Sequence, residues 1–149
     1  MDINKPINCQ ATSNLSVNIP DPDGKNIVLY FYPKDSTPGC TTEGNDFSDN
    51  HKSFVDANTV IYGVSRDSIK SHEKFKAKQG FPFELIADID EILCKHFDVI
   101  KLKKLYGREY MGIDRSTFLI SPNGETIKSW RSVKVKGHVD EVLTRVQSL

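Results

Sequence analysis

One cysteine, Cys40, stands in a sequence context that suits it for chemistry as an ionised thiol. It follows an apolar run, 27–32, and precedes a stretch that begins at Thr41 and has the pattern of a helix. The free N–H groups and positive dipole end of a helix favour an anion, and they lower a cysteine pKa from about 8.5 to roughly 3.5 to 7.5. The sequence therefore predicts a thiolate nucleophile at Cys40.

The neighbours of Cys40 fit such a site. Pro33 restricts the backbone of the preceding loop, and Gly39 permits close approach of a ligand or an unusual turn. Thr37 lies three residues before Cys40, so a first helical turn brings its hydroxyl near the sulfur. Far along the chain, Arg115 precedes another apolar run and supplies a permanent cation that can fold back over the loop.

The elements around these residues alternate between strands and helices. Strands are expected at 15–19, 27–32, 59–64, 83–87, 116–121 and 125–133, and helices at 41–57, 68–78, 89–97 and 138–146. The helix at 89–97 would turn Ile92, Leu93 and Phe97 toward the core. This order predicts one α/β domain over 1–149, with a central mixed sheet and helices on both faces.

Composition narrows the function classes. Twenty acidic residues balance twenty basic ones among 149, so there is no global attraction to nucleic acid or to an anionic membrane. No apolar run approaches the ~20 residues of a membrane span, and the start of the chain lacks a signal region, so a cytoplasmic protein is expected. The cysteines Cys9, Cys40 and Cys94 are odd in number and contain no Cys-x-x-Cys pair, which argues against a disulfide scaffold.

The loop and the segment around Arg115 resemble the peroxiredoxins, specifically the Q type, also called bacterioferritin comigratory proteins. Family members carry Pro-x-x-x-Thr-x-x-Cys after a hydrophobic strand, matched here by Pro33, Thr37 and Cys40. The longer family string Tyr-Pro-Lys-Asp-x-Thr-Pro-Gly-Cys-Thr-Thr-Glu is found at 32–43, and Gly-Ile-x-Arg-Ser-Thr-Phe at 112–118. The resemblance extends over nearly the whole chain because these pieces occur in the family's order.

The resemblance implies a thioredoxin-like fold and a thiol-dependent peroxidase that reduces hydrogen peroxide and organic hydroperoxides. Cys40 would be the peroxidatic residue and would cycle through a sulfenic acid. Thr37, Arg115 and the backbone N–H groups of Gly39 and Cys40 would bind the peroxide, while Pro33 would pack over the sulfur. No cofactor or metal is expected. The reductant would be thioredoxin, glutaredoxin or glutathione, and the protein a monomer or weak homodimer.

Two departures from the family pattern concern recycling. The resolving cysteine that many relatives carry five residues after the peroxidatic one is replaced here by Asn45, and the alternative position in the next helix is Lys76. Either Cys94 or Cys9 would then resolve the sulfenic acid, or an external thiol would. Cys94 also reads as a filler at the edge of an apolar face, and Cys9 lies near a terminus expected to be mobile. An external thiol is narrowly preferred.

Other readings remain open at this stage. The chain could be a thioredoxin-fold binding module with an inert cysteine, or a nucleic-acid adaptor that uses basic residues around Trp130. Glu43 reads first as a complement to the helix dipole rather than as a catalytic group. The four histidines are scattered without a zinc pattern and read as structural or solvated. The basic residues are Lys101, Lys103, Lys104, Lys128, Arg131, Lys134 and Lys136.

Overall fold

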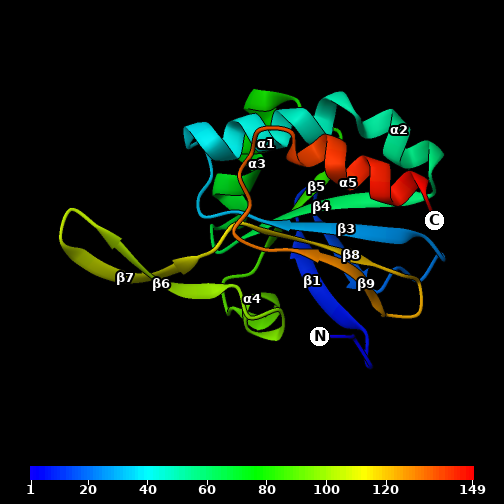
Figure 1. Ribbon diagram of the computed structural model, residues 1–149, viewed down its shortest axis with the longest axis horizontal. Coiled ribbons are helices and arrows are strands. Elements are labelled where there is room, and N and C mark those ends of the chain that lie inside the picture. Colours follow the sequence, from blue (N-terminus) through cyan, green and yellow to red (C-terminus); the bar gives the residue numbers. More distant parts are fainter.

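A seven-stranded mixed sheet forms the centre of the fold (Figure 1). The computed structural model describes residues 1–149. Strands β3, β4 and β5 run parallel, and the outer strands pair antiparallel. The order across the sheet is β2 (Leu15–Ile19), β1 (Ile7–Ala11), β5 (Glu84–Ala87), β4 (Thr59–Ser65), β3 (Asn26–Phe31), β8 (Ser116–Ile120) and β9 (Thr126–Trp130). The expected mixed sheet is confirmed.

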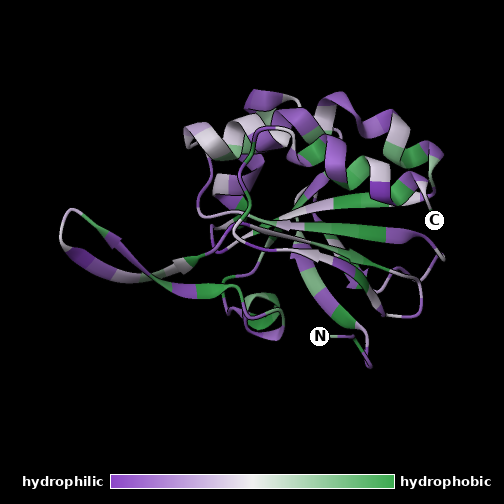
Figure 2. Cartoon of the chain, in the orientation of Figure 1, coloured by the Kyte–Doolittle hydropathy of each residue, from purple (hydrophilic) through white to green (hydrophobic).

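The sheet separates two hydrophobic clusters. Four helices cover one face: α1 (Pro38–Asp49), α2 (His51–Asp56), α3 (Ile69–Gln79) and α5 (His138–Gln147). The short helix α4 (Ile92–His96) lies on the other face (Figure 1). Figure 2 shows hydrophobic segments along the central strands and hydrophilic ones over much of the helical layer. Helices therefore occupy both faces, as the alternating pattern predicts.

Strand β3 carries the chain to the Cys40 loop, and its composition reflects complete burial. All of its residues after Asn26 are buried, since β4 and β8 pair on either side and both faces are covered. A continuous apolar run is what such a strand requires. The last pair between β3 and β8 is Phe31 with Ser116, so the loop after β3 starts beside Arg115.

The helix expected over 41–57 is two helices. Helix α1 begins earlier, at Pro38, where a missing N–H is tolerated, and Thr37 is its N-cap residue. Asn50 has φ −105° and ψ 8°, which ends α1 and starts α2. Cys40 is consequently the third residue of α1 and lies within its first turn.

Other boundaries differ in length. The helix expected over 89–97 begins only at Ile92, because Glu91 takes a left-handed conformation with φ 60°. Ile92 is 57% exposed, so its predicted place in the core is wrong, whereas Leu93 and Phe97 are fully buried. Strand β9 ends at Trp130, so the strand expected over 125–133 is shorter than predicted, and 131–136 form no strand.

Two strand regions carried no clear sequence signal. Strand β1 is short and partly polar, and it pairs with both β2 and β5. Strands β6 (Ile100–Leu105) and β7 (Arg108–Ile113) form a separate hairpin that projects from the body (Figure 1). Tyr106 and Gly107 make its turn with φ 51° and 76°. No helix combines the length and apolar character that crossing a membrane requires.

Candidate active site

Cys40 is held in a buried position at the start of α1. Its side chain is only 2% exposed and belongs to the cluster on the helical face of the sheet. The first turn of α1 is closed by a bond from the N–H of Thr41 to the carbonyl of Thr37. The N–H groups of Gly39 and Cys40 precede that bond, at the helix end where backbone donors lack intrahelical acceptors.

Arg115 contacts the sulfur of Cys40, as the sequence led us to expect. Its Nη2 donates to Sγ at 3.3 Å, and its Nη1 donates to Oε1 of Glu43 at 2.6 Å. Burial disfavours the charge on Arg115, but Glu43 and Cys40 outweigh that effect and raise the pKa of the guanidinium above its usual value. A permanent cation with fixed orientation thus faces the thiol.

Gly39 is where this guanidinium approaches the loop most closely. A Cβ atom at this position would lie 3.2 Å from Nη2 of Arg115, closer than ordinary van der Waals contact. The φ angle of Gly39 is not positive. Gly39 therefore permits the close approach of another group, and that group is a side chain of the protein itself rather than a ligand. The backbone makes no unusual turn at this residue.

Glu43 contacts Arg115, and the sequence did not predict this contact. Its side chain is fully buried against Arg115, and α1 has no acidic residue in its first turn, so complementing the helix dipole is not its main role. Burial raises its pKa to about 7, although Arg115 acts in the opposite direction. The remaining oxygen, Oε2, has no hydrogen-bond partner. The spacing from Cys40 to Glu43 places both on one helix face, which was the available signal.

Thr37 and Pro33 shape the loop. The hydroxyl of Thr37 donates to the carbonyl of Lys34 at 2.8 Å and makes no side-chain cap on α1. Thr37 and Pro33 are both half-buried. A groove of about 550 Å³ adjoins Gly39 between α1 and the segment 135–140, and its lining includes neither Cys40 nor Arg115.

Cys9 and Cys94 lie on the opposite side of the sheet from Cys40. Both belong to the cluster that α4 covers, whereas Cys40 belongs to the other. Burial, followed by the charge of Asp88, raises the pKa of Cys9 to about 12. Burial and a hydrogen bond with Asp88 raise the pKa of Cys94 further. Cys9 is buried within β1, so the expected mobile terminus is wrong at this residue, and all three thiols are free.

The two positions where relatives carry a resolving cysteine make polar contacts here. The side-chain amide of Asn45 donates to Oε1 of Gln79 at 3.3 Å, which links α1 to α3. The ammonium group of Lys76 lies 2.8 Å from both Oε1 of Glu84 and Oγ of Ser13.

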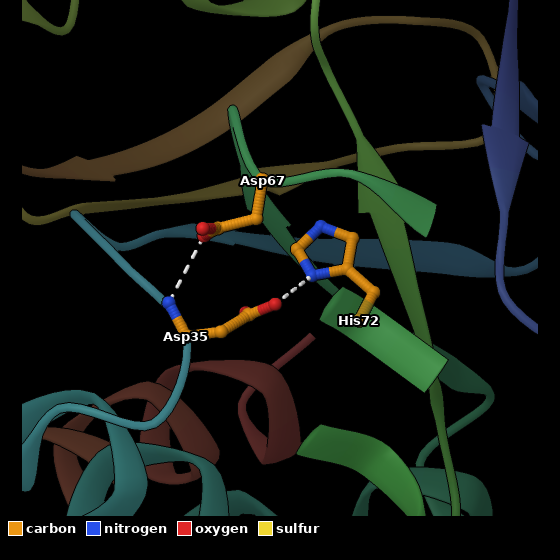
Figure 3. A group of neighbouring side chains, drawn as sticks. All are labelled: Asp35, Asp67 and His72. Carbon is orange, nitrogen blue, oxygen red and sulfur yellow. Dashed lines mark hydrogen bonds and ion pairs between the residues drawn. The ribbon is translucent and has the colours of Figure 1, made fainter. Parts of the chain in front are cut away.

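A second cluster of polar side chains includes a residue of the Cys40 loop, and the sequence did not predict it. Asp35, Asp67 and His72 come together from the loop, the segment after β4 and helix α3 (Figure 3). His138 is also buried, with its Nε2 2.8 Å from Oγ1 of Thr117. Of the two roles expected for the histidines, structural or solvated, only the structural one fits His72 and His138.

The basic residues are divided among the projecting hairpin, strand β9 and the segment 131–136. Lys101, Lys103 and Lys104 lie on the projecting hairpin, whereas Lys128 is on β9. Arg131 donates to the carbonyls of Phe97 and Asp98. The side chain of Arg131, one of the basic residues around Trp130, is therefore hydrogen-bonded within the fold.

Comparison with known proteins identifies the family. Residues 4–129 match the AhpC/TSA family. The chain belongs to this family. It is 58% identical over 122 residues to peroxiredoxin Bcp of Xanthomonas campestris pv. campestris, covering 82% of this chain and 76% of the relative. It is 56% identical over 134 residues to peroxiredoxin Bcp of Bacillus subtilis, covering 90% and 85%.

Solved structures agree with the sequence comparison. Xanthomonas campestris peroxiredoxin Q superposes with a TM-score of 0.90 at 51% identity, covering 95% of this chain and 90% of that one. A structure of the bacterioferritin comigratory protein of the same organism, concerned with its alkyl peroxide reduction activity, gives 0.90 at 46% identity, covering 99% and 98%. This peroxiredoxin therefore has a thioredoxin-like fold and is a thiol-dependent peroxidase.

Proposed function

We propose that Cys40 is the peroxidatic residue and that it reduces hydrogen peroxide and organic hydroperoxides. The observation that carries this proposal is the contact of 3.3 Å between Nη2 of Arg115 and Sγ of Cys40. A charged donor stabilises a negative sulfur, which is the nucleophilic form of a cysteine. A binding module with an inert cysteine has no need of this contact.

The reaction is a displacement at oxygen. The thiolate attacks one peroxide oxygen, the O–O bond breaks, and the other oxygen takes a proton and leaves as water or an alcohol. Cys40 then carries a sulfenic acid. Negative charge develops on the leaving oxygen, so donors aimed at it accelerate the step. Arg115 and the N–H groups of Gly39 and Cys40 are the proposed donors. The hydroxyl of Thr37 is a further proposed donor once it turns away from the carbonyl of Lys34, and Pro33 is the proposed cover over the sulfur.

Replacement of the nucleophile tests this assignment. We expect Cys40→Ser to abolish peroxide consumption and to keep the circular dichroism spectrum and melting temperature near those of wild type, because little volume changes. Cys9→Ser is the matched control and should retain turnover. Near-normal turnover by Cys40→Ser would refute the assignment.

We further propose that an external thiol, from glutathione, glutaredoxin or thioredoxin, recycles Cys40. The other two cysteines lie across the sheet and have raised pKa values, and Asn45 and Lys76 cannot form disulfides. The external thiolate attacks the sulfenic sulfur and expels hydroxide, which leaves as water after protonation, so a mixed disulfide forms. A second thiol attacks that disulfide and releases Cys40.

Mass spectrometry distinguishes the two routes of recycling. After one equivalent of peroxide, the protein should gain one oxygen at Cys40, and added glutathione should convert this species to a mixed disulfide. A loss of two hydrogens would show an internal bridge. Rapid formation of a Cys40–Cys94 bond, with loss of thioredoxin-dependent turnover in Cys94→Ser, would refute the external route.

A further inference from the structure

Asp35, in the loop between β3 and α1, is fixed by three side chains. Its Oδ1 accepts a hydrogen bond from the hydroxyl of Tyr32 at 2.6 Å, and its Oδ2 accepts one from Oγ of Ser71 at 2.8 Å. Nδ1 of His72 lies 2.7 Å from the same Oδ2 (Figure 3). Ser71 and His72 belong to α3, so the carboxylate joins the Cys40 loop to that helix.

Both ring nitrogens of His72 have partners within the fold. Its Nε2 lies 2.9 Å from the carbonyl oxygen of Ile86, which can only accept, so Nε2 carries a proton. Its Nδ1 faces the carboxylate of Asp35. Burial raises the pKa of Asp35, but the hydrogen bonds from His72 and Tyr32 outweigh it and leave that pKa below its usual value. The ionised Asp35 therefore makes a buried, charge-assisted contact with His72.

The backbone of the loop is held at the same residue. The N–H of Asp35 donates to Oδ2 of Asp67 at 2.9 Å, and Asp67 is oriented in turn by the hydroxyl of Ser65. Side chain and backbone of one loop residue are thus attached to α3 and to the segment after β4. Asp35 lies between Pro33 and Thr37, so these bonds act on the segment that leads directly into Cys40.

A metal ion is the competing reading of these residues. Ligand atoms of Asp35, Asp67 and His72 lie within 4.8 Å of one another. The atoms already have hydrogen-bond partners within the protein, however, and a cation would have to break the contact between Nδ1 of His72 and Asp35. The hydrogen-bonded Asp35–His72 pair is the interpretation that uses every observed contact.

We propose that the Asp35–His72 pair is a latch that keeps the Cys40 loop closed on α3, and that its release exposes the oxidised sulfur to a reductant. The exposure step rests on the proposed recycling by an external thiol. Cys40 is almost fully buried, so a protein thiol reaches its sulfur only when the loop and the first turn of α1 open. Opening withdraws Asp35 from His72. The pair therefore sets the equilibrium between a closed form that suits the peroxide and an open form that suits the reductant.

Hydrogen exchange on the reduced protein tests the latch without any reductant. The amides of Asp35 and Thr41 report opening, because they bond to Asp67 and Thr37. Loss of a charge-assisted bond should raise the open population in His72→Phe by at least about tenfold. His72→Asn keeps an N–H donor on a shorter side chain and should give an intermediate increase. His138→Phe, which removes another buried histidine, should leave these two amides unchanged relative to global exchange.

The rates of the two half-reactions distinguish control of loop opening from a merely structural role of His72. His72→Phe should accelerate capture of the sulfenic acid by glutathione while leaving oxidation by peroxide equal or slower. Asp35→Asn combined with His72→Phe should open the loop no more than the larger single effect, since either change alone already removes the Asp35–His72 contact. If His72→Phe does not fold, Asp35→Asn and His72→Asn are compared by the same exchange measurement.

Three results would overturn the proposal. One is equal protection of the Asp35 and Thr41 amides in wild type and the His72 variants. Another is fully additive effects of the Asp35 and His72 changes. The third is stoichiometric binding of Zn²⁺ or Mn²⁺ to wild type that His72→Asn abolishes. An internal disulfide would refute the external-thiol proposal but would leave the exchange result unchanged, so the two failures are distinguishable.

Discussion

Glu43 and Arg115 form a partly buried ion pair next to the sulfur of Cys40. One arm of the guanidinium lies 2.6 Å from the carboxylate, and the other lies 3.3 Å from Sγ. A planar group held at one arm has a defined direction at the other. The carboxylate thereby orients the cation that faces the thiol.

This geometry predicts that Arg115→Lys retains the charge but loses much of the rate. A single ammonium group cannot contact Glu43 and the sulfur with the same fixed fork. We expect the rate constant for oxidation of Cys40, measured by stopped-flow, to fall by about a hundredfold. Arg145→Lys, at the end of α5, is the control and should behave as wild type. An unchanged oxidation rate in Arg115→Lys would remove Arg115 from the site.

A second prediction concerns Glu43→Gln and pH. Burial holds the pKa of Glu43 near 7, above its ordinary value of 4.5, so the folded protein binds this proton more tightly than the unfolded chain does. The free energy of unfolding contributed by Glu43 therefore falls as pH rises from 4.5 to 7. Glu43→Gln lacks this loss, and urea unfolding should show its advantage over wild type growing between pH 5 and pH 8.

The same substitution should alter the pH profile of oxidation. The amide oxygen of Gln can still accept from Arg115, so the rate should remain within about tenfold of wild type. Titration of Glu43 should give the wild-type rate an inflection near pH 7, and Glu43→Gln should lose it. Glu109→Gln removes an exposed carboxylate that pairs with Lys104 and serves as the control. Persistence of the inflection in Glu43→Gln would assign it to another group.

A third prediction follows from the close approach at Gly39. In Gly39→Ala the new Cβ would stand 3.2 Å from Nη2 of Arg115, so the guanidinium must move by a few tenths of an ångström. We expect about tenfold slower oxidation of Cys40 with little change in melting temperature. In an Arg115→Ala background, Gly39→Ala should cause no further loss. Additive losses would place the effect of Gly39 elsewhere.

The sequence reveals the site best where its signal is local. Cys40 and Thr37 lie in one short segment after a strongly apolar strand, and that order predicted the loop and the helix after it, although α1 begins at Pro38 rather than at Thr41. Arg115 is distant in sequence, but it lies next to a strand that pairs with β3, so sheet register delivers it to the loop.

The missed features depend on tertiary burial. A glutamate near the start of a helix usually faces water, and nothing local shows that Glu43 points inward. His72 is likewise unremarkable until β5 and the loop surround it with a carbonyl and a carboxylate. The sequence did not predict the β6–β7 hairpin, because its strands are largely exposed and rich in lysine. They lack the hydrophobic pattern that identifies a buried strand.

A fourth prediction concerns stability in acid. Burial and the charge of Arg115 lower the pKa of His138 from 6.5 to about 4, so this imidazole is neutral in the folded protein at pH 6. The unfolded chain binds the proton more readily, and the free energy of unfolding therefore falls as pH drops from 6.5 toward 4. His138→Gln should lose less stability over this range in urea titrations. A parallel decline in both proteins would exclude His138 as a cause.

The last prediction concerns the two cysteines across the sheet. Burial raises the pKa values of Cys9 and Cys94, so neither is an effective nucleophile at neutral pH, and the sheet lies between them and Cys40. We expect Cys9→Ser with Cys94→Ser to leave glutathione-dependent or thioredoxin-dependent turnover within about twofold of wild type, since an external thiol makes the only disulfide. Thiol labelling of the folded wild type at pH 7 should modify Cys40 alone, and denaturant should expose the other two. Turnover that collapses in the double variant, while the single-turnover oxidation of Cys40 remains normal, would show that one of these cysteines crosses to the site during recycling.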